Sequence, residues 1–281
     1  LTQNGFLFNF SATFTDDLDI VTTVFYYKLD TFLKDGYGKK LYIADSDFKN
    51  FNKEMSDDFS INEKKDIIAQ TLIIFALTKE HFHKMQAMNK NLYHAPLLIT
   101  LANSVNTEEA DLKIFYKLLA EIARGKFNFE VAKNNLVAKL ENNKGYLFGL
   151  GDIDQNLISE ISNLKKENFF KAVFNAENQS NIEIVKFKDN SRELAFKLVG
   201  ASKYFMLIVA SDIIKWESNV LEGYEFGRVI GESFFDDINK RNDINILLGS
   251  RIFAEGWDTN RPNVINFINI GVSDDAKKFV L

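Results

Sequence analysis

Short apolar runs of strand length alternate with longer helix-like segments along most of this chain, and that alternation restricts the possible folds most strongly. The clearest runs are Leu97–Ala102, Phe205–Ala210, Ile244–Leu248 and Val264–Ile268. Strands that alternate with helices form parallel sheets, because each helix carries the chain back across a face of the sheet. We therefore predict an α/β fold with a parallel sheet and flanking helices.

Capping signals mark where the helices begin. Ser60 and Glu63 form a capping box, in which each side chain satisfies a first-turn amide of the other residue. Apolar residues then keep a helical period to about Met88. Similar signals predict helices over residues 107–124 and 130–140.

A β-hairpin is predicted between the helical and the later strand segments. Ile182–Phe187 and Leu194–Val199 flank a polar, turn-forming stretch at residues 188–191. We expect this hairpin to be an added element at the edge of the domain, within an insertion around residues 145–200.

The composition is that of a folded globular protein. The chain has 281 residues, of which 46% are hydrophobic and 26% charged, enough for one large domain or two modest ones. No cysteine is present, which excludes disulfides and thiolate chemistry and suits a reducing cytoplasm. The longest apolar stretches, such as Ile67–Leu77, are shorter than the roughly 20 residues that span a bilayer. We expect a cytoplasmic protein.

The sequence does not predict a metal site. His81 and His83 are two residues apart on a predicted helix and point in different directions, whereas metal pairs need a spacing of three or four. Glu108, Glu109 and Asp111 fall in the first turn of another predicted helix, where they complement its dipole. A serine hydrolase is also disfavoured, because no Gly-x-Ser-x-Gly elbow is present.

Gly249–Asp258, with the sequence GSRIFAEGWD, follows one strand-like run and precedes another. In open α/β sheets, ligands bind beyond the carboxyl ends of the strands. Gly256 allows close approach of the backbone to a ligand, and the Asp258 carboxylate can accept hydrogen bonds from ribose hydroxyls. This segment therefore indicates nucleotide chemistry.

Two more segments carry the same kind of signal. Ser11-Ala12-Thr13 follows the apolar run Phe6–Phe10, and residues 96–107 read PLLITLANSVNT. The first resembles motif III of the superfamily 2 (DEAD/DEAH-like) helicases, and the second resembles the strand and loop around motif IV. Residues 249–271 resemble motif V of one branch, the restriction (Res) subunit of type III restriction-modification enzymes.

The resemblance implies a RecA-like fold and a division of the chain. Residues 1–58 would hold the end of the first RecA-like lobe and the linker between lobes. Residues 59–281 would form the second helicase lobe, incomplete at its C-terminus and carrying the insertion. The Gly-x-x-x-x-Gly-Lys-Ser/Thr loop that cradles phosphates is not in this sequence, and residues 36–40 have the wrong glycine spacing for it. The arginines of motif VI are expected after Leu281.

The resemblance also assigns roles to individual residues. Ser11, Ala12 and Thr13 would couple the nucleotide state to DNA binding; a strand-ending turn is the structural alternative. Glu255, Gly256 and Asp258 would bind ATP, with a loop or N-cap role as the alternative for Asp258. The residues expected to contact DNA are Asn103, Ser104, Asn106, Gly249, Ser250 and Arg251. A polar turn is the alternative for residues 103–106. Arg251 and Arg261 would face phosphate or lie on the surface.

The function implied is that of an ATP-dependent DNA translocase of a type III restriction endonuclease. The full-length parent would use ATP and Mg²⁺, and its partners would be double-stranded DNA and methyltransferase subunits. The first motor lobe and the nuclease domain would lie elsewhere in the parent chain, so this fragment alone is expected to be inactive. The net charge of -5 opposes a broad basic surface, although a motor holds only a few phosphates in a cleft. The alternatives are a related superfamily 2 helicase or repair translocase without a nuclease, and a non-catalytic α/β binding module.

Overall fold

The computed structural model describes residues 21–25, 27, 29–37, 42–44, 60–90, 93–102, 111–142, 146–148, 155–188, 190–210, 213, 226–249 and 259–269. The helices are α2 (Leu29–Lys34), α4 (Ile61–Met88), α5 (Asp111–Ala123), α6 (Phe129–Glu141), α7 (Gln155–Asn163) and α8 (Lys166–Phe174). The strands are β1 (Tyr42–Ala44), β2 (Leu97–Ala102), β3 (Tyr146–Phe148), β4 (Ile182–Phe187), β5 (Glu193–Leu198), β6 (Tyr204–Val209), β7 (Phe226–Ile230), β8 (Ile246–Gly249) and β9 (Pro262–Asn269).

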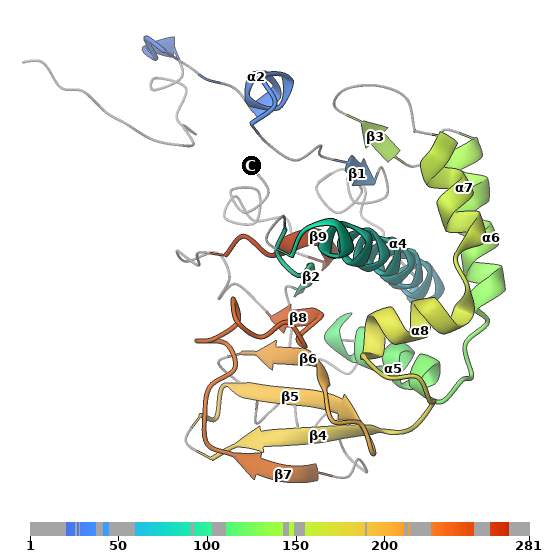
Figure 1. The fold of residues 1–281 in the computed structure, drawn as a ribbon, viewed down its shortest axis with the longest axis vertical. Coiled ribbons are helices and arrows are strands. Elements are labelled where there is room, and N and C mark those ends of the chain that lie inside the picture. The colour runs from blue at the N-terminus through green and yellow to red at the C-terminus, as the bar shows by residue number, and fades with distance from the viewer. Residues whose placement is uncertain are drawn as a thin grey trace, which may run out of the picture.

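The main sheet contains seven of the described strands in the order β7-β4-β5-β6-β8-β2-β9 (Figure 1). The strands β6, β8, β2 and β9 form a parallel block, and β7 runs parallel to β4. Only β5, among the described strands of this sheet, runs against its neighbours. The predicted α/β fold is thus confirmed, with a sheet that is mostly parallel. The short strands β1 and β3 pair separately.

Alternate residues of each strand point to opposite faces of the sheet. Both faces are buried, since a separate apolar core packs against each of them. Met206 and Ile208 of β6 pack into the core that contains the helices α4 to α8. Leu207 and Val209 of the same strand pack on the other side, against Phe234 and Ile238. Those two residues belong to the connection from β7 to β8, which covers the second face without forming a helix.

Helix α4 lies beside β9 and contacts α5, α6, α7 and α8 (Figure 1). The helices α5 and α8 also pack on the sheet, through Tyr116 against Phe196 and Phe174 against Phe205. Helix α4 begins as predicted: Ser60 Oγ accepts from the Glu63 amide at 3.3 Å, and the Ser60 amide donates to Glu63 Oε2 at 2.9 Å. Ile68, Leu72 and Phe75 are fully buried, because neighbours surround the helix on several sides.

The predicted hairpin forms, but the prediction that it lies at the edge of the domain is wrong. β4 and β5 pair as an antiparallel hairpin, and β5 then pairs with β6 while β4 pairs with β7. Most residues of both strands are buried, and the hairpin forms part of the main sheet between β7 and β6. The helices α7 and α8 and the strand β7 were not predicted from the sequence.

In the described part of the chain, no helix combines the length and the apolar character that crossing a membrane requires.

Candidate functional site

Two of the segments predicted to form the site follow, in the sequence, parallel strands that end at one edge of the sheet. β2 and β8 are neighbours in register, with Leu98 beside Ile246 and Leu101 beside Gly249. On the other side of β2, Ala102 lies beside Asn269 of β9. The last residues of three parallel strands therefore lie at one edge, which is where open α/β sheets bind ligands.

Of the residues expected to bind ATP or DNA or to couple the two, the described part of the chain contains Gly249; Arg261, expected to face phosphate or lie on the surface, is also described. Gly249 is the last residue of β8, between Leu101 of β2 and Val209 of β6. In the sequence, Asn103 follows the end of β2, and Ser250 follows the end of β8. The remaining predicted site residues lie outside the described residues: Ser11, Ala12, Thr13, Asn103, Ser104, Asn106, Ser250, Arg251, Glu255, Gly256 and Asp258.

Glu193 also lies at this edge, because β5 runs antiparallel and starts where β6 ends. Its carboxylate is buried and accepts four hydrogen bonds, from the Asn190 side chain at 2.6 Å, the Ser233 hydroxyl at 2.6 Å and the amides of Phe234 and Phe235 at 2.9 and 3.2 Å. A carboxylate satisfied in this way anchors a loop. Glu193 thus fixes the start of the connection from β7 to β8.

Arg261 takes neither of the two roles predicted for it. Its side chain is 1% exposed, so it neither faces phosphate nor lies on the surface. The guanidinium donates instead to the backbone carbonyls of Ala95, Ile238, Arg241 and Ile244, at 2.5 to 2.9 Å. Burial lowers its pKa to about 10, so the group stays charged at neutral pH. Four of its five N–H groups are used by the backbone.

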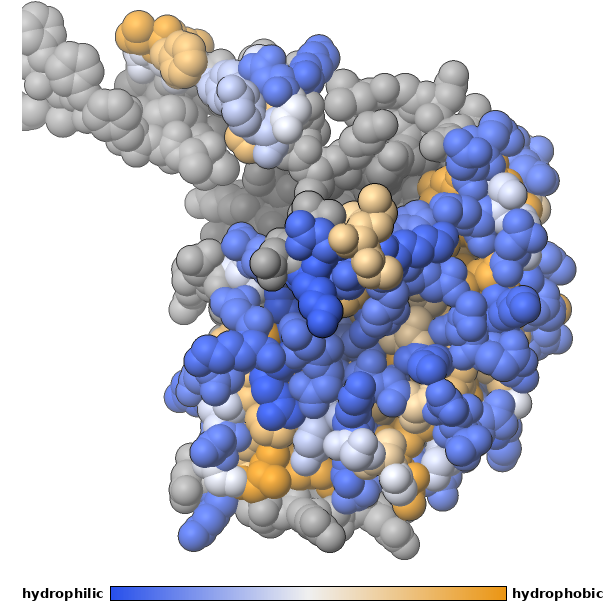
Figure 2. Space-filling model, in the orientation of Figure 1, coloured by the Kyte–Doolittle hydropathy of each residue, from blue (hydrophilic) through white to orange (hydrophobic). Residues whose placement is uncertain are grey.

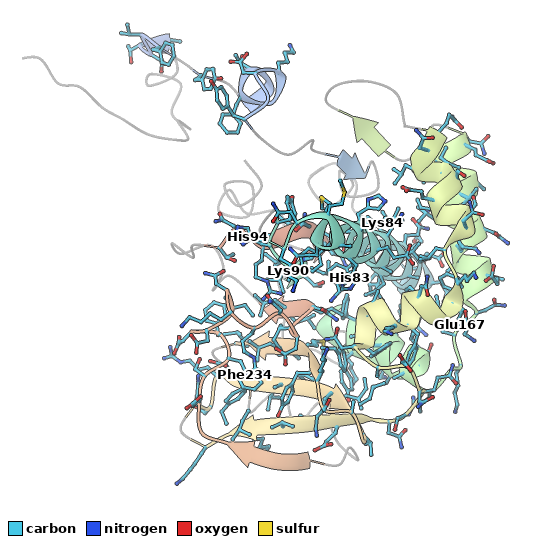
Figure 3. All side chains as sticks on the ribbon, in the orientation of Figure 1. His83, Lys84, Lys90, His94, Glu167 and Phe234 are labelled. Carbon is cyan, nitrogen blue, oxygen red and sulfur yellow. The ribbon has the colours of Figure 1, made fainter. Side chains whose placement is uncertain are left out.

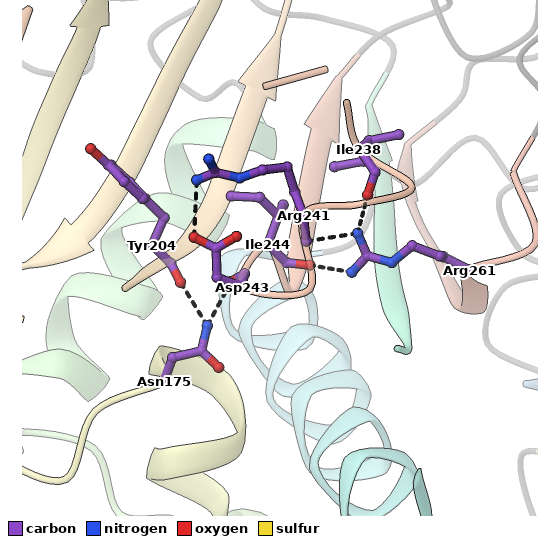
Figure 4. A network of polar contacts seen from close by, with 7 residues as sticks. All are labelled: Asn175, Tyr204, Ile238, Arg241, Asp243, Ile244 and Arg261. Carbon is purple, nitrogen blue, oxygen red and sulfur yellow. Dashed lines mark hydrogen bonds and ion pairs between the residues drawn. The ribbon is translucent and has the colours of Figure 1, made fainter. Parts of the chain in front are cut away.

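The Arg261 carbonyl contacts hold together the amino-terminal edge of the sheet (Figure 4). Beside them, Arg241 pairs with Asp243 at 3.0 Å and lies over the Phe234 ring at 3.5 Å. Asn175, in the left-handed conformation at the end of α8, donates to the carbonyls of Tyr204 and Asp243, both at 2.6 Å. The segments that lead into β6 and β8 are therefore tied to the end of α8.

A cavity of about 840 Å³ lies at this same amino-terminal edge, opposite to the edge where β2, β8 and β9 end. Its walls come from α4, from α8 and from the residues that precede β2, β6 and β8. The ionisable side chains in its lining are Lys79, Glu80, His83, Lys84, Lys171, Lys203 and Asp243. His83 and Lys84 lie on α4 (Figure 3), and the centre of the face in Figure 2 is predominantly hydrophilic. We call this cavity the basic cleft.

Lys79 is the buried cation of the basic cleft. It is 5% exposed, and its ammonium donates to Asn245 Oδ1 at 2.6 Å. Asn245 Nδ2 in turn donates to the Ala172 and Val173 carbonyls at 2.9 and 3.0 Å, at the end of α8. Burial is the main cause that lowers the Lys79 pKa to about 8, and Arg261 and Lys203 add to the lowering. No carboxylate of the described residues forms an ion pair with Lys79.

The burial of Lys79 has a signal in the sequence. Lys79 follows Phe75 by one helical turn and Leu72 by two, and both of those residues are fully buried. A lysine in register with the apolar face of a helix is a candidate for burial. Its partner Asn245 is the one polar residue in the apolar run Ile244–Leu248, which also indicates a buried polar side chain.

The two neighbouring histidines diverge, as their spacing predicts. His81 Nε2 lies 2.8 Å from Glu160 Oε2 of α7, whereas His83 lines the basic cleft. Partial burial lowers the pKa of His83, and the nearby cations Lys79, Lys171 and Lys203 lower it further. Among the described residues, no group of three metal-ligating side chains could hold an ion.

Comparison of the chain with protein-family models, with curated proteins and with solved structures gave no match.

We predict that Arg261→Lys lowers the free energy of unfolding by roughly 2–4 kcal/mol, because an ammonium cannot reach carbonyls on several sides and leaves some without a donor. Urea denaturation measures the change. Arg192→Lys is the matched control, since Arg192 is exposed, and we expect it to alter stability by less than about 0.5 kcal/mol. Equal effects of the two substitutions would contradict the structural role of Arg261.

We also predict that Lys79 makes stability increase with pH. Between pH 8 and 10.5 the folded state loses the Lys79 proton while the unfolded state keeps it, so stability rises across that window, by about 3 kcal/mol in total. Lys79→Met removes this rise. Urea denaturation at both ends of the window, in phosphate-free buffer, compares the two proteins. Exposed Lys165→Met should behave like the unaltered chain, and a parallel pH dependence in Lys79→Met would refute the assignment.

Proposed function

We propose that this chain is part of the ATP-driven DNA translocase motor of a type III restriction endonuclease. It contributes one wall of the ATP site between two motor lobes and part of the cleft that holds DNA. The observation that supports this most directly is that β2 and β8 are adjacent parallel strands. The two segments that resemble motifs IV and V follow these strands in the sequence.

This adjacency matters because the two segments are far apart in the chain. A sheet in which β2 and β8 were separated, or ran in opposite directions, would have placed their ends apart. Their last described residues instead share one edge, beside the end of β9. Amide and hydroxyl side chains such as those of Asn103, Ser104 and Asn106 are common ligands of backbone phosphates. A RecA-like lobe is also consistent with the parallel block β6-β8-β2-β9 and its layer of helices.

In the proposed motor, ATP binds between this lobe and the first one. The Asp258 carboxylate accepts hydrogen bonds from the ribose hydroxyls, and Gly256 lets the backbone approach the nucleotide. Binding and hydrolysis then move the two lobes as rigid bodies. Among the described residues, no group of three His, Cys, Asp or Glu side chains could hold a metal ion. The phosphate loop is absent from this sequence, and we expect no ATP hydrolysis by the chain alone.

A related superfamily 2 helicase or repair translocase would use the same edge in the same way. The presence of a nuclease domain in the full-length parent would indicate a restriction enzyme, and its absence would indicate one of these other motors. A non-catalytic α/β module differs more sharply, because it predicts that Asp258 has no effect on ATP hydrolysis.

We predict that Asp258→Ala reduces DNA-stimulated ATP hydrolysis by the full-length parent at least about tenfold, through loss of ribose contacts worth about 1.4 kcal/mol or more. Phosphate release in the presence of duplex DNA measures the rate. Asp237→Ala is the control, because Asp237 is exposed and pairs only with an exposed lysine at 2.9 Å. Unchanged hydrolysis by a folded Asp258→Ala protein would favour the binding module.

We further predict that DNA lies along the carboxyl edge of the sheet. These 281 residues contain no cysteine, so Asn103→Cys introduces a single thiol into this part of the parent. Once any cysteine elsewhere in the parent is replaced by serine, that thiol can carry a photoactivatable crosslinker. In the full-length parent it should crosslink to duplex DNA. Val199→Cys is the control, since Val199 is 50% exposed and follows the end of β5 at the opposite edge. Crosslinking that is equal at both positions, or absent at Asn103→Cys, would place the DNA elsewhere.

A further inference from the structure

The basic cleft has an excess of positive charge that the described residues do not neutralise. Both carboxylates in its lining already have partners, since Asn168 donates to Glu80 at 2.7 Å and Arg241 pairs with Asp243 at 3.0 Å. Lys84 and Lys171 pair with Glu160 and Glu177 at the surface, where such pairs are weak. Lys79 and Lys203 have no ion-pair partner among the described residues.

The position of Lys79 makes its positive charge suited to binding an anion inside the basic cleft, and not only to attracting anions to the surface. Its ammonium is buried and carries one hydrogen bond, to Asn245 Oδ1, although an ammonium has three donors. Lys79 also lines the cavity. A buried charge is costly unless it is paired, so an anion that entered the cavity would gain a strong interaction there.

The size and the lining of the cleft restrict the anion. A volume of about 840 Å³ is within the range of sites for small organic ligands, and far exceeds the space that one phosphate ion needs. Phe82, Ala95 and Ala172 supply an apolar wall, and Asn168, Asn175 and Asn242 supply neutral polar groups. A phosphate monoester carries a charge near -2 and three acceptor oxygens, which suits two or more ammonium groups.

We propose that the basic cleft binds a small organic phosphate, with the phosphate between Lys79 and Lys203 and the organic part along Phe82. A DNA backbone does not fit this site, because Lys79 is 5% exposed and a duplex can reach only the rim. The site lies at the edge opposite to the one assigned to DNA and ATP, so it is independent of the proposed motor function.

Binding has a second consequence that can be measured. Lys79 is partly deprotonated near pH 8, because burial, Arg261 and Lys203 lower its pKa and only Asp243 raises it. A dianion beside the ammonium raises that pKa again. Organic phosphate should therefore bind with uptake of protons between pH 8 and 9, which a simple surface contact with Lys203 would not produce.

The test is isothermal titration calorimetry of the 281-residue chain at low ionic strength, with adenosine monophosphate, ribose 5-phosphate and inorganic phosphate as probes. We expect at least one organic phosphate to bind more tightly than inorganic phosphate. Lys203→Ala and Lys79→Met should each weaken it about tenfold or more, whereas exposed Lys165→Ala should not. Repeating the titration at pH 8.5 in buffers of different ionisation enthalpy measures the proton uptake, which should vanish in Lys79→Met.

Several results would overturn the proposal. If neither organic phosphate binds at about 1 mM, the proposed site does not exist. If the organic phosphates bind no more tightly than inorganic phosphate, the cleft does not recognise the organic part of the ligand. Duplex DNA that competes for the site, with an affinity that depends on Lys203 and not on Lys79, would identify a nucleic-acid surface instead. Lys203 is exposed, so Lys203→Ala keeps the test valid if Lys79→Met fails to fold.

Discussion

The buried guanidinium of Arg261 is the interaction on which the amino-terminal edge of the sheet depends. It binds the carbonyls of Ala95 and Ile244, which precede β2 and β8, and those of Ile238 and Arg241 in the connection that covers the second face. The Ile238 and Arg241 carbonyls also accept from the backbone amides of Arg241 and Ile244. Burying the Ala95 and Ile244 carbonyls without a donor would cost free energy. One planar group with donors on several sides reaches all four carbonyls at once. That requirement explains why an arginine, and not a lysine, occupies this position.

A second polar connection joins the helices to the same edge. Asn245 accepts from Lys79 of α4 and donates to the last carbonyls of α8. With Asn175, which ties α8 to Tyr204 and Asp243, it fixes the helical layer against the starts of β6 and β8. These contacts stiffen the walls of the basic cleft. They leave Lys79 facing the cavity with donors to spare.

The two edges of the sheet thus differ in construction. The carboxyl edge brings together the ends of β2, β8 and β9, after which the sequence continues into the polar segments that resemble helicase motifs. The amino edge is closed by backbone hydrogen bonds to Arg261 and contains the basic cleft. The basic cleft is thus separate from the edge at which the proposed motor would bind DNA and nucleotide.

The sequence by itself determined the α/β class, the capped start of α4, the pairing of β4 with β5 and the strands β2, β6, β8 and β9, because capping and hydrophobic periodicity act over short distances. Only the tertiary structure decided which strands are neighbours. It placed β8 beside β2 and β6, and it put the hairpin inside the sheet. It also decided the hydrogen-bond partners of Arg261 and Lys79. The helical register of Lys79 indicates burial, but the carbonyl and amide groups that these two side chains contact are distant in the sequence, and no local pattern identifies them.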